Sequence, residues 1–183
     1  MQEIRIHGRG GQGAVTSAEL IAIAAINKGK SAQAFPSFGP ERRGAPVVAF
    51  CRVDDKKINI RAKVYNPDVV IVLDPGLVNI LDPSEGMNEG GILIINTKKG
   101  PESAGNTHGQ SIKIATVDAS KIANEELGRN IVNTTMIGAF IKTTGIISIE
   151  DIQGPLMERF GAKLGSKNMK ALERAYKEVT IQG

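Results

Sequence analysis

The chain has 183 residues, of which 41% are hydrophobic, so it is long enough for one well-buried domain and too apolar for a disordered chain. Only 4% of its residues are aromatic, with no Trp, and 21 are Gly, a composition that favours close-packed α/β layers. The net charge of +4 permits an anionic partner, but Lys and Arg are scattered without interleaved aromatics, so we expect no nucleic-acid partner.

The cysteine count and the hydropathy pattern indicate where the protein works. A single cysteine, Cys51, excludes an internal disulfide and suits a reducing compartment. It also excludes an iron–sulfur cluster held by this chain alone, because such clusters need several thiolates. No apolar run approaches 18 residues and no leader pattern opens the chain. We therefore expect a soluble, cytoplasmic protein with no membrane partner.

The first 27 residues predict a strand, a glycine turn and a helix. Ile4 and Ile6 alternate with polar neighbours, and the turn Gly8-Arg9-Gly10-Gly11-Gln12-Gly13 follows at once. Apolar residues then recur at helical spacing over residues 15–27, and Asn27-Lys28-Gly29-Lys30 is typical of a helix end.

The next segment mixes strands with an unusual loop. Residues 31–35 predict a second strand, and residues 35–46 predict an ordered loop because three Pro and two Gly exclude a helix. Residues 47–53 and 57–60 flank Asp54-Asp55-Lys56, so we predict an antiparallel hairpin between them.

The rest of the chain alternates strands with helices. We predict buried strands at residues 69–73, 92–96 and 112–117, and helices at residues 75–81, 119–127, 131–144, 148–160 and about 169–179. Together the elements predict one domain over residues 1–183 with an α/β, Rossmann-like three-layer fold. Its sheet is expected to be mixed but mostly parallel, with an antiparallel hairpin.

The glycine turn is the strongest candidate site. Free N–H groups at a helix start bind anions, and Gly8, Gly10 and Gly13 fit a dinucleotide fingerprint. A NAD site also needs an acid near the end of the second strand, and residues 28–35 contain none. NAD is therefore disfavoured, whereas NADP stays open because Lys28 and Lys30 could meet a 2′-phosphate.

Other polar residues are weaker candidates. Arg42 and Arg43 suit bidentate phosphate or carboxylate recognition, or simply pair with surface acids. His7 is predicted to be a packed strand residue, Cys51 a small buried one and His108 an exposed one. Asp68 and Asp74 are predicted to be turn and cap residues. With no triad or metal spacing visible, we expect no catalytic residue and no metal ligand in this chain.

Several separated motifs carry a family resemblance. They are the glycine turn, Phe35-Pro36-x-Phe38-Gly39-x-Glu41-Arg42-Arg43-Gly44-Ala45-Pro46, Asn66-Pro67-Asp68, Val132-Asn133-Thr134 and Leu164-Gly165-x-Lys167-Asn168. With them, the chain closely resembles gamma subunits of pyruvate:ferredoxin oxidoreductases (pyruvate synthases) over nearly its whole length. The Glu-Arg-Arg-Gly-Ala-Pro form resembles the pyruvate or branched-chain 2-oxoacid type.

The resemblance implies a division of labour in a heterotetramer of alpha, beta, gamma and delta subunits. Thiamine diphosphate with Mg, and [4Fe–4S] clusters, would lie in partner subunits, with ferredoxin as electron acceptor. The enzyme would convert pyruvate to acetyl-coenzyme A, or run in reverse, and this chain would be inactive alone. In fused relatives, the equivalent domain helps to bind coenzyme A. The resemblance thus implies a coenzyme A site at Gly8, Arg9, Gly10, Gly11, Gln12, Gly13, Phe38, Arg42, Arg43, Asn133 and Asn168.

Three alternatives stay open at this point. The chain could serve a branched-chain 2-oxoacid:ferredoxin oxidoreductase, because other subunits would read the carbon skeleton. It could be a purely structural docking subunit whose glycine turn serves only packing. It could also be a stand-alone NADP-binding reductase.

Overall fold

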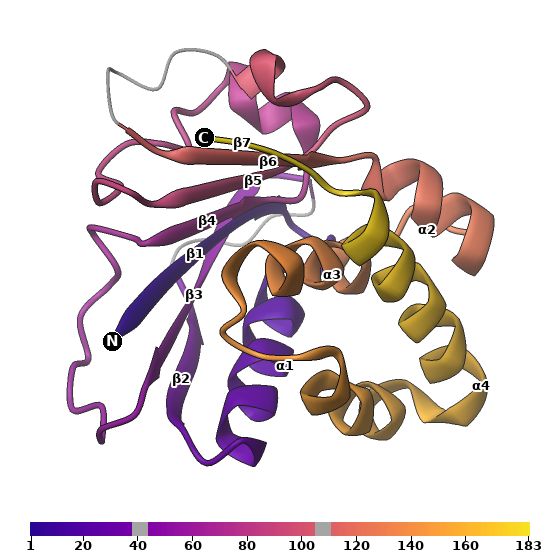
Figure 1. The fold of residues 1–183 in the computed structure, drawn as a ribbon, viewed down its shortest axis with the longest axis horizontal. Coiled ribbons are helices and arrows are strands. Elements are labelled where there is room, and N and C mark those ends of the chain that lie inside the picture. The colour runs from indigo at the N-terminus through magenta and orange to yellow at the C-terminus, as the bar shows by residue number, and fades with distance from the viewer. Residues whose placement is uncertain (38–43, 105–110) are drawn as a thin grey trace.

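The computed structural model describes residues 1–37, 44–104 and 111–183 (Figure 1). Within these ranges the chain forms one seven-stranded sheet, four α-helices and two short 3-10 helices. The strands are β1 (Gln2–Arg9), β2 (Ser31–Pro36), β3 (Pro46–Asp54), β4 (Val69–Val72), β5 (Ile92–Asn96), β6 (Lys113–Val117) and β7 (Thr180–Gln182). The helices are α1 (Ala14–Asn27), η1 (Pro75–Asn79), η2 (Pro101–Ala104), α2 (Ala119–Leu127), α3 (Asn133–Thr144) and α4 (Ile149–Glu178).

The sheet has the strand order β2-β3-β1-β4-β5-β6-β7. Strands β1, β4, β5 and β6 are parallel to one another, whereas β3 runs antiparallel to β1 and β2, and β7 runs antiparallel to β6. The predicted α/β class and mixed sheet are confirmed. Because four neighbouring strands run the same way, their carboxyl ends meet at one edge, where α/β proteins bind ligands.

The α-helices all cover one face of the sheet, as Figure 1 shows. Ile4 and Ile6 of β1 point into this layer, in one core with residues from all four α-helices. Val70 and Val72 of β4 point the other way, into a smaller core closed by η1. Strand β4 is apolar at every position because both of its faces are buried.

The predicted helix caps are confirmed. Asp74 accepts a hydrogen bond from the Gly76 amide at the start of η1, and Asp118 accepts one from the Lys121 amide in α2. Ser148 and Asp151 form the predicted capping box of α4. Helix α4 is broken at Gly161, where φ is 73° and ψ is 165°. It therefore consists of two helices, as the sequence predicts, but the second begins directly after Gly161 rather than at about residue 169.

The structure corrects the predicted hairpin. Residues 57–60 form no strand, and β3 pairs instead with β2 and β1. The antiparallel hairpin therefore joins Ser31–Pro36 to Pro46–Asp54. The local pattern at 57–60 offers only Ile58 for burial, whereas β2 brings a longer run that packs on α1. Strand β7, which lacks an apolar pattern and is exposed throughout, was not predicted.

Candidate functional site

The glycine turn joins β1 to α1 at the carboxyl edge of the sheet. Gly11 and Gly13 have φ angles of 93° and 82°, a left-handed conformation that favours glycine. Gly13 occupies the N-cap position of α1 and has no side chain with which to cap it. The first helical turn of α1 also carries no acidic side chain. Its free N–H groups therefore point out of the helix start with no side chain to accept their hydrogen bonds.

Hydrogen bonds within the turn fix its shape. The Arg9 amide donates to Oε1 of Gln12 at 2.7 Å, and the Gln12 amide donates back to the Arg9 carbonyl at 2.9 Å. The Gln12 side-chain amide then donates to Asp74 at the end of β4, at 2.9 Å. The Arg9 guanidinium pairs with the same carboxylate at 3.2 Å. Asp74, predicted only as a cap, thus also anchors the turn to the neighbouring strand.

The chain entering β3 lies directly on the turn. Gly10 donates to the Ala45 carbonyl at 2.9 Å and accepts a hydrogen bond from the Gly44 amide at 3.2 Å. The Arg9 side chain donates to the Gly44 carbonyl at 3.2 Å. The Pro- and Gly-rich loop of the sequence therefore returns to the sheet beside the turn. Phe38, Arg42 and Arg43 lie outside the described residues, so their part in the site stays a prediction.

Asn133, at the start of α3, contacts the turn. A Cβ atom at Gly13 would lie 2.6 Å from Nδ2 of Asn133. The Ser17 hydroxyl links the two segments, at 3.3 Å from the carbonyl oxygen of Gly13 and from that of Asn133. The Asn133 side chain is 5% exposed, yet its Oδ1 atom has no hydrogen-bond partner. Such an orphaned buried oxygen beside an uncapped helix start suits a bound ligand or water.

Asn168 contacts the neighbour of Asn133 rather than the turn itself. Its Oδ1 atom accepts a hydrogen bond from Thr134, the neighbour of Asn133, and its Nδ2 atom donates to the Leu164 carbonyl at 2.9 Å. The side chain is 4% exposed. Asn168 therefore braces α3 against α4, and a contact between it and coenzyme A stays a prediction.

A cavity of about 400 Å³ lies at the same edge of the sheet, between η1, the end of β5 and the start of α2. It adjoins the turn because a Cβ atom at Gly76 would lie 3.4 Å from the Arg9 guanidinium. Sequence patterns did not predict this cavity. The available signal was that Lys98 and Lys99 follow a buried strand almost directly. The polar lining consists of Asn79, Asn96, Thr97, Lys98, Lys99, Asp118 and Ser120.

His7 is buried without a partner, on the face of the sheet opposite the α-helices. Its side chain is 7% exposed and neither ring nitrogen makes a hydrogen bond. Burial, and to a smaller extent the nearby Arg5 charge, lowers the pKa of His7 to about 4. The prediction of a packed strand residue is confirmed, and His7 is neutral at physiological pH. Burial also lowers the pKa of Arg5, which donates to the carbonyls of Pro83 and Glu85.

The described residues include one cysteine, which is buried, and no metal-binding cluster. Cys51 is fully buried, and burial raises the pKa of its thiol to about 12, so it is unreactive, as its position in the sequence predicts. Over the three described ranges, no group of three or more His, Cys, Asp or Glu side chains could hold a metal ion. His108 lies outside these ranges. Within the same ranges, no helix is long and apolar enough to span a membrane.

The sheet geometry explains why the dinucleotide pattern is incomplete. In a dinucleotide fold, the strand after the first helix lies next to the first strand and carries an acid for the ribose. Here the antiparallel strand β3 lies between β1 and β2. The end of β2 is thus one strand further from the turn, a displacement of about 5 Å.

Comparison with known proteins places nearly the whole chain in one family. Residues 3–178 match the family described as pyruvate ferredoxin/flavodoxin oxidoreductase. A relative from Thermococcus kodakarensis, the common subunit gamma of pyruvate/ketoisovalerate oxidoreductases, is 50% identical over 182 residues, covering 99% of this chain and 98% of the relative.

Solved structures show the same fold. The pyruvate oxidoreductase subunit PORC from Thermotoga maritima is 42% identical, with a TM-score of 0.88 over 100% of this chain and 98% of that one. The 2-oxoglutarate:ferredoxin oxidoreductase from Magnetococcus marinus, solved with 2-oxoglutarate, coenzyme A and succinyl-CoA, is 19% identical, with a TM-score of 0.80. That match covers 96% of this chain and 30% of the other and shows the fold alone. The chain therefore belongs to the pyruvate ferredoxin/flavodoxin oxidoreductase family, as a gamma-type subunit.

Proposed function

We propose that this chain contributes a coenzyme A site to its oxidoreductase, with a phosphate of coenzyme A bound by the turn of residues 8–13. One observation carries the proposal. The uncapped start of α1 lies against Asn133, and the buried Oδ1 atom of Asn133 has no hydrogen-bond partner. At the contact, Gly13 leaves no room for a side chain of its own. Helix-start amides donate to a phosphate oxygen, and the amide oxygen of Asn133 accepts from a ligand donor.

The chemistry of the site favours coenzyme A over NADP. Coenzyme A and NADP each carry a diphosphate and a separate ribose phosphate, so each needs a second cationic region near the turn. The cavity beside the turn has Lys98 and Lys99 in its wall and a volume of about 400 Å³, within the ~300–1,000 Å³ range of ligand pockets. For NADP, the candidate cations were Lys28 and Lys30. They follow the end of α1 and lie beside Met1 and Gln2 at the start of β1, at the edge of the sheet away from the turn.

The rest of the reaction belongs to partners. In this proposal, alpha, beta and delta subunits complete a cytoplasmic complex and hold thiamine diphosphate, Mg and [4Fe–4S] clusters. The complex oxidatively decarboxylates pyruvate to acetyl-coenzyme A and reduces ferredoxin, or runs the reverse reaction. A branched-chain 2-oxoacid is the second candidate substrate, because the T. kodakarensis relative is named as common to pyruvate and ketoisovalerate oxidoreductases.

Two variants of Gly11 test the coenzyme A site in the assembled complex. No atom lies within 4 Å of a Cβ atom at Gly11, so Gly11→Asp and Gly11→Asn fit equally well and share the same positive φ. Asn and Asp also tolerate this conformation better than other side chains. The two variants differ only by one negative charge at the turn. We expect Gly11→Asp to raise the KM for coenzyme A at least tenfold over Gly11→Asn, with thiamine diphosphate binding unchanged in both.

Equal KM values for coenzyme A in the two variants would overturn the proposal. If the turn served only packing, both variants would instead lower the amount of complex that assembles, and to the same extent. Substrate choice needs a separate measurement, which compares pyruvate with 3-methyl-2-oxobutanoate as substrates of the wild-type complex.

A further inference from the structure

The connection between β3 and β4, residues 55–68, is a long segment that contains no helix or strand. Connections longer than about 12–15 residues without secondary structure are uncommon in compact domains unless they are functional or disordered. This one is anchored to the sheet at several points. Ile58 and Val64 are 9% and 3% exposed, and their side chains hold the segment in place.

Hydrogen bonds add to this anchoring. The Ile58 amide donates to the Ser31 hydroxyl at 3.3 Å, and the Gln33 side chain donates to the Ile58 carbonyl at 3.1 Å. Arg52 donates to the Lys63 carbonyl at 3.1 Å. Arg52 is itself only 1% exposed, paired with Glu3 at 2.6 Å and stacked on the Phe35 ring. A buried arginine is thus used to hold a surface segment in a fixed shape.

The outer surface of this segment is both cationic and apolar. Residues 56–65 contain no acid, and their four exposed cations form no ion pair within the part of the chain that the structure describes. Tyr65 is 69% exposed, more than any other large hydrophobic residue in the described ranges, and Ile60 is 44% exposed. The cations are Lys56, Lys57, Arg61 and Lys63. We call residues 56–65 the basic loop.

We propose that the basic loop is a docking surface for an acidic face of another subunit of the oxidoreductase. Tyr and Arg side chains are enriched at protein interfaces, which also have a polar rim, and a preformed loop loses little conformational entropy on binding. Complementary charge would speed encounter and reject wrong partners. A second copy of this chain is disfavoured, since a self-contact would bring two basic loops together.

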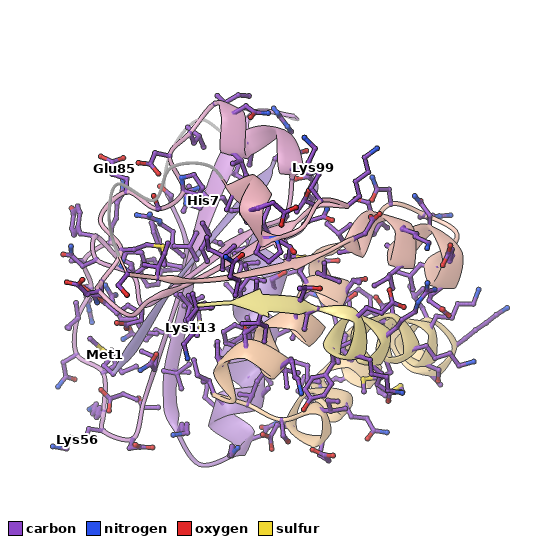
Figure 2. The ribbon with its side chains drawn as sticks, turned by 45° about the horizontal axis from the view of Figure 1, so that its top comes forward. Met1, His7, Lys56, Glu85, Lys99 and Lys113 are labelled. Atoms are coloured by element: carbon purple, nitrogen blue, oxygen red, sulfur yellow. The ribbon has the colours of Figure 1, made fainter. Side chains whose placement is uncertain are left out.

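The position of the basic loop leaves the glycine turn accessible. The loop follows the end of β3, which pairs with the start of β1, whereas the turn follows the end of β1. Figure 2 accordingly shows Lys56 at the lower left of the molecule and Lys99, from the cavity beside the turn, near the top. A subunit on the basic loop therefore holds the chain in the complex without covering the turn.

Zero-length carbodiimide cross-linking of the assembled complex tests the proposal, because it joins a lysine only to a carboxylate in direct contact. We expect Lys57 and Lys63 to cross-link to Asp or Glu residues of another subunit. The exposed lysines Lys121 and Lys170, on α2 and α4, are the internal reference. Cross-links from Lys57 or Lys63 only to a second copy of this chain, or none above the level of the reference lysines, would overturn it.

Charge reversal gives an independent measure. We expect Lys57→Glu/Arg61→Glu to raise the dissociation constant for the remaining subunits at least tenfold, and Tyr65→Ala at least threefold. Lys121→Glu/Lys170→Glu makes the same change in net charge at a distance from the basic loop. This control variant should leave the dissociation constant unchanged. Equal dissociation constants for the two double variants would refute the docking surface. Because this readout is assembly, it is separate from the KM for coenzyme A.

Discussion

Gly13 and Asn133 lie so close together that Gly13 has no room for a Cβ atom. A Cβ atom at Gly13 would lie 2.6 Å from Nδ2 and 3.0 Å from Cγ of Asn133. The two residues are far apart in the sequence: Gly13 is the N-cap of α1, and Asn133 is the first residue of α3. Their contact brings the amides of one helix start and the side chain of another to the same point. It therefore defines the candidate anion site and makes it sensitive to a single methyl group.

Gly13→Ala is expected to damage both stability and coenzyme A binding. The positive φ alone costs about 1–2 kcal/mol for a non-glycine residue, and the clash with Asn133 brings the total to about 2–4 kcal/mol. Urea unfolding of the isolated chain measures the stability. Gly11→Ala is the matched control, with a φ of 93° but open space around its Cβ, so it should show only the smaller cost. Equal losses in the two variants would contradict the packing of Asn133 on the turn.

His7 makes stability depend on pH below neutrality. Its pKa is about 4 in the folded chain against a usual value of 6.5, so the unfolded chain binds the additional proton between these values. The free energy of unfolding should hold above pH 6.5 and fall as the pH drops from 6.5 to 4, by on the order of 3 kcal/mol. Chemical denaturation at a series of pH values measures this.

The variant His7→Leu isolates that effect. Leucine has no charge to desolvate and leaves no ring nitrogen unpartnered, so the fall between pH 6.5 and pH 4 should shrink. A pH profile unchanged from that of the wild type would assign the acid sensitivity to other groups.

Arg52 is expected to order the basic loop. Arg52→Met keeps the apolar volume but loses the ion pair with Glu3 and the hydrogen bond to the Lys63 carbonyl. The cost should be about 1–3 kcal/mol, below the ~3–5 kcal/mol typical of fully buried pairs because Glu3 is 22% exposed. Hydrogen exchange at residues 57–64 should become faster. Arg52→Lys keeps the positive charge without the planar guanidinium group, so its stability and exchange rates should lie between those of the wild type and Arg52→Met. Unchanged exchange in Arg52→Met would exclude this role.

Gly138 allows α3 and α4 to pack closely. A Cβ atom there would overlap the Leu172 carbonyl oxygen and come within 3.1 Å of the Tyr176 amide. Gly138→Ala should therefore cost more than about 3 kcal/mol, measured by thermal or urea unfolding. The control is Gly154→Ala in α4, where a Cβ atom meets no other atom within 4 Å, and alanine should stabilise the helix by up to about 1 kcal/mol. A neutral Gly138→Ala would show that the two helices can separate without loss.

Much of the fold was readable from the sequence because it rests on local chemistry. The continuous apolar run at residues 69–73 is typical of a strand buried on both faces. Asp74, Asp118 and Ser148 are helix caps, and capping depends on residues that are close in the sequence. The glycine turn was likewise predicted because positive φ angles and close backbone approach require glycine.

Tertiary structure decided the rest. The pairing of β3 with β2 rather than with residues 57–60, and the strand β7, depend on which segments meet across the sheet. The contacts of Asn133 with Gly13 and of Arg9 with Asp74, and the cavity with Lys98 and Lys99 in its wall, join residues that sequence spacing does not relate. The sequence thus determined the elements and the turn that can bind an anion. Only the packed sheet decided which distant side chains surround that turn, because burial and register act between segments far apart in the chain.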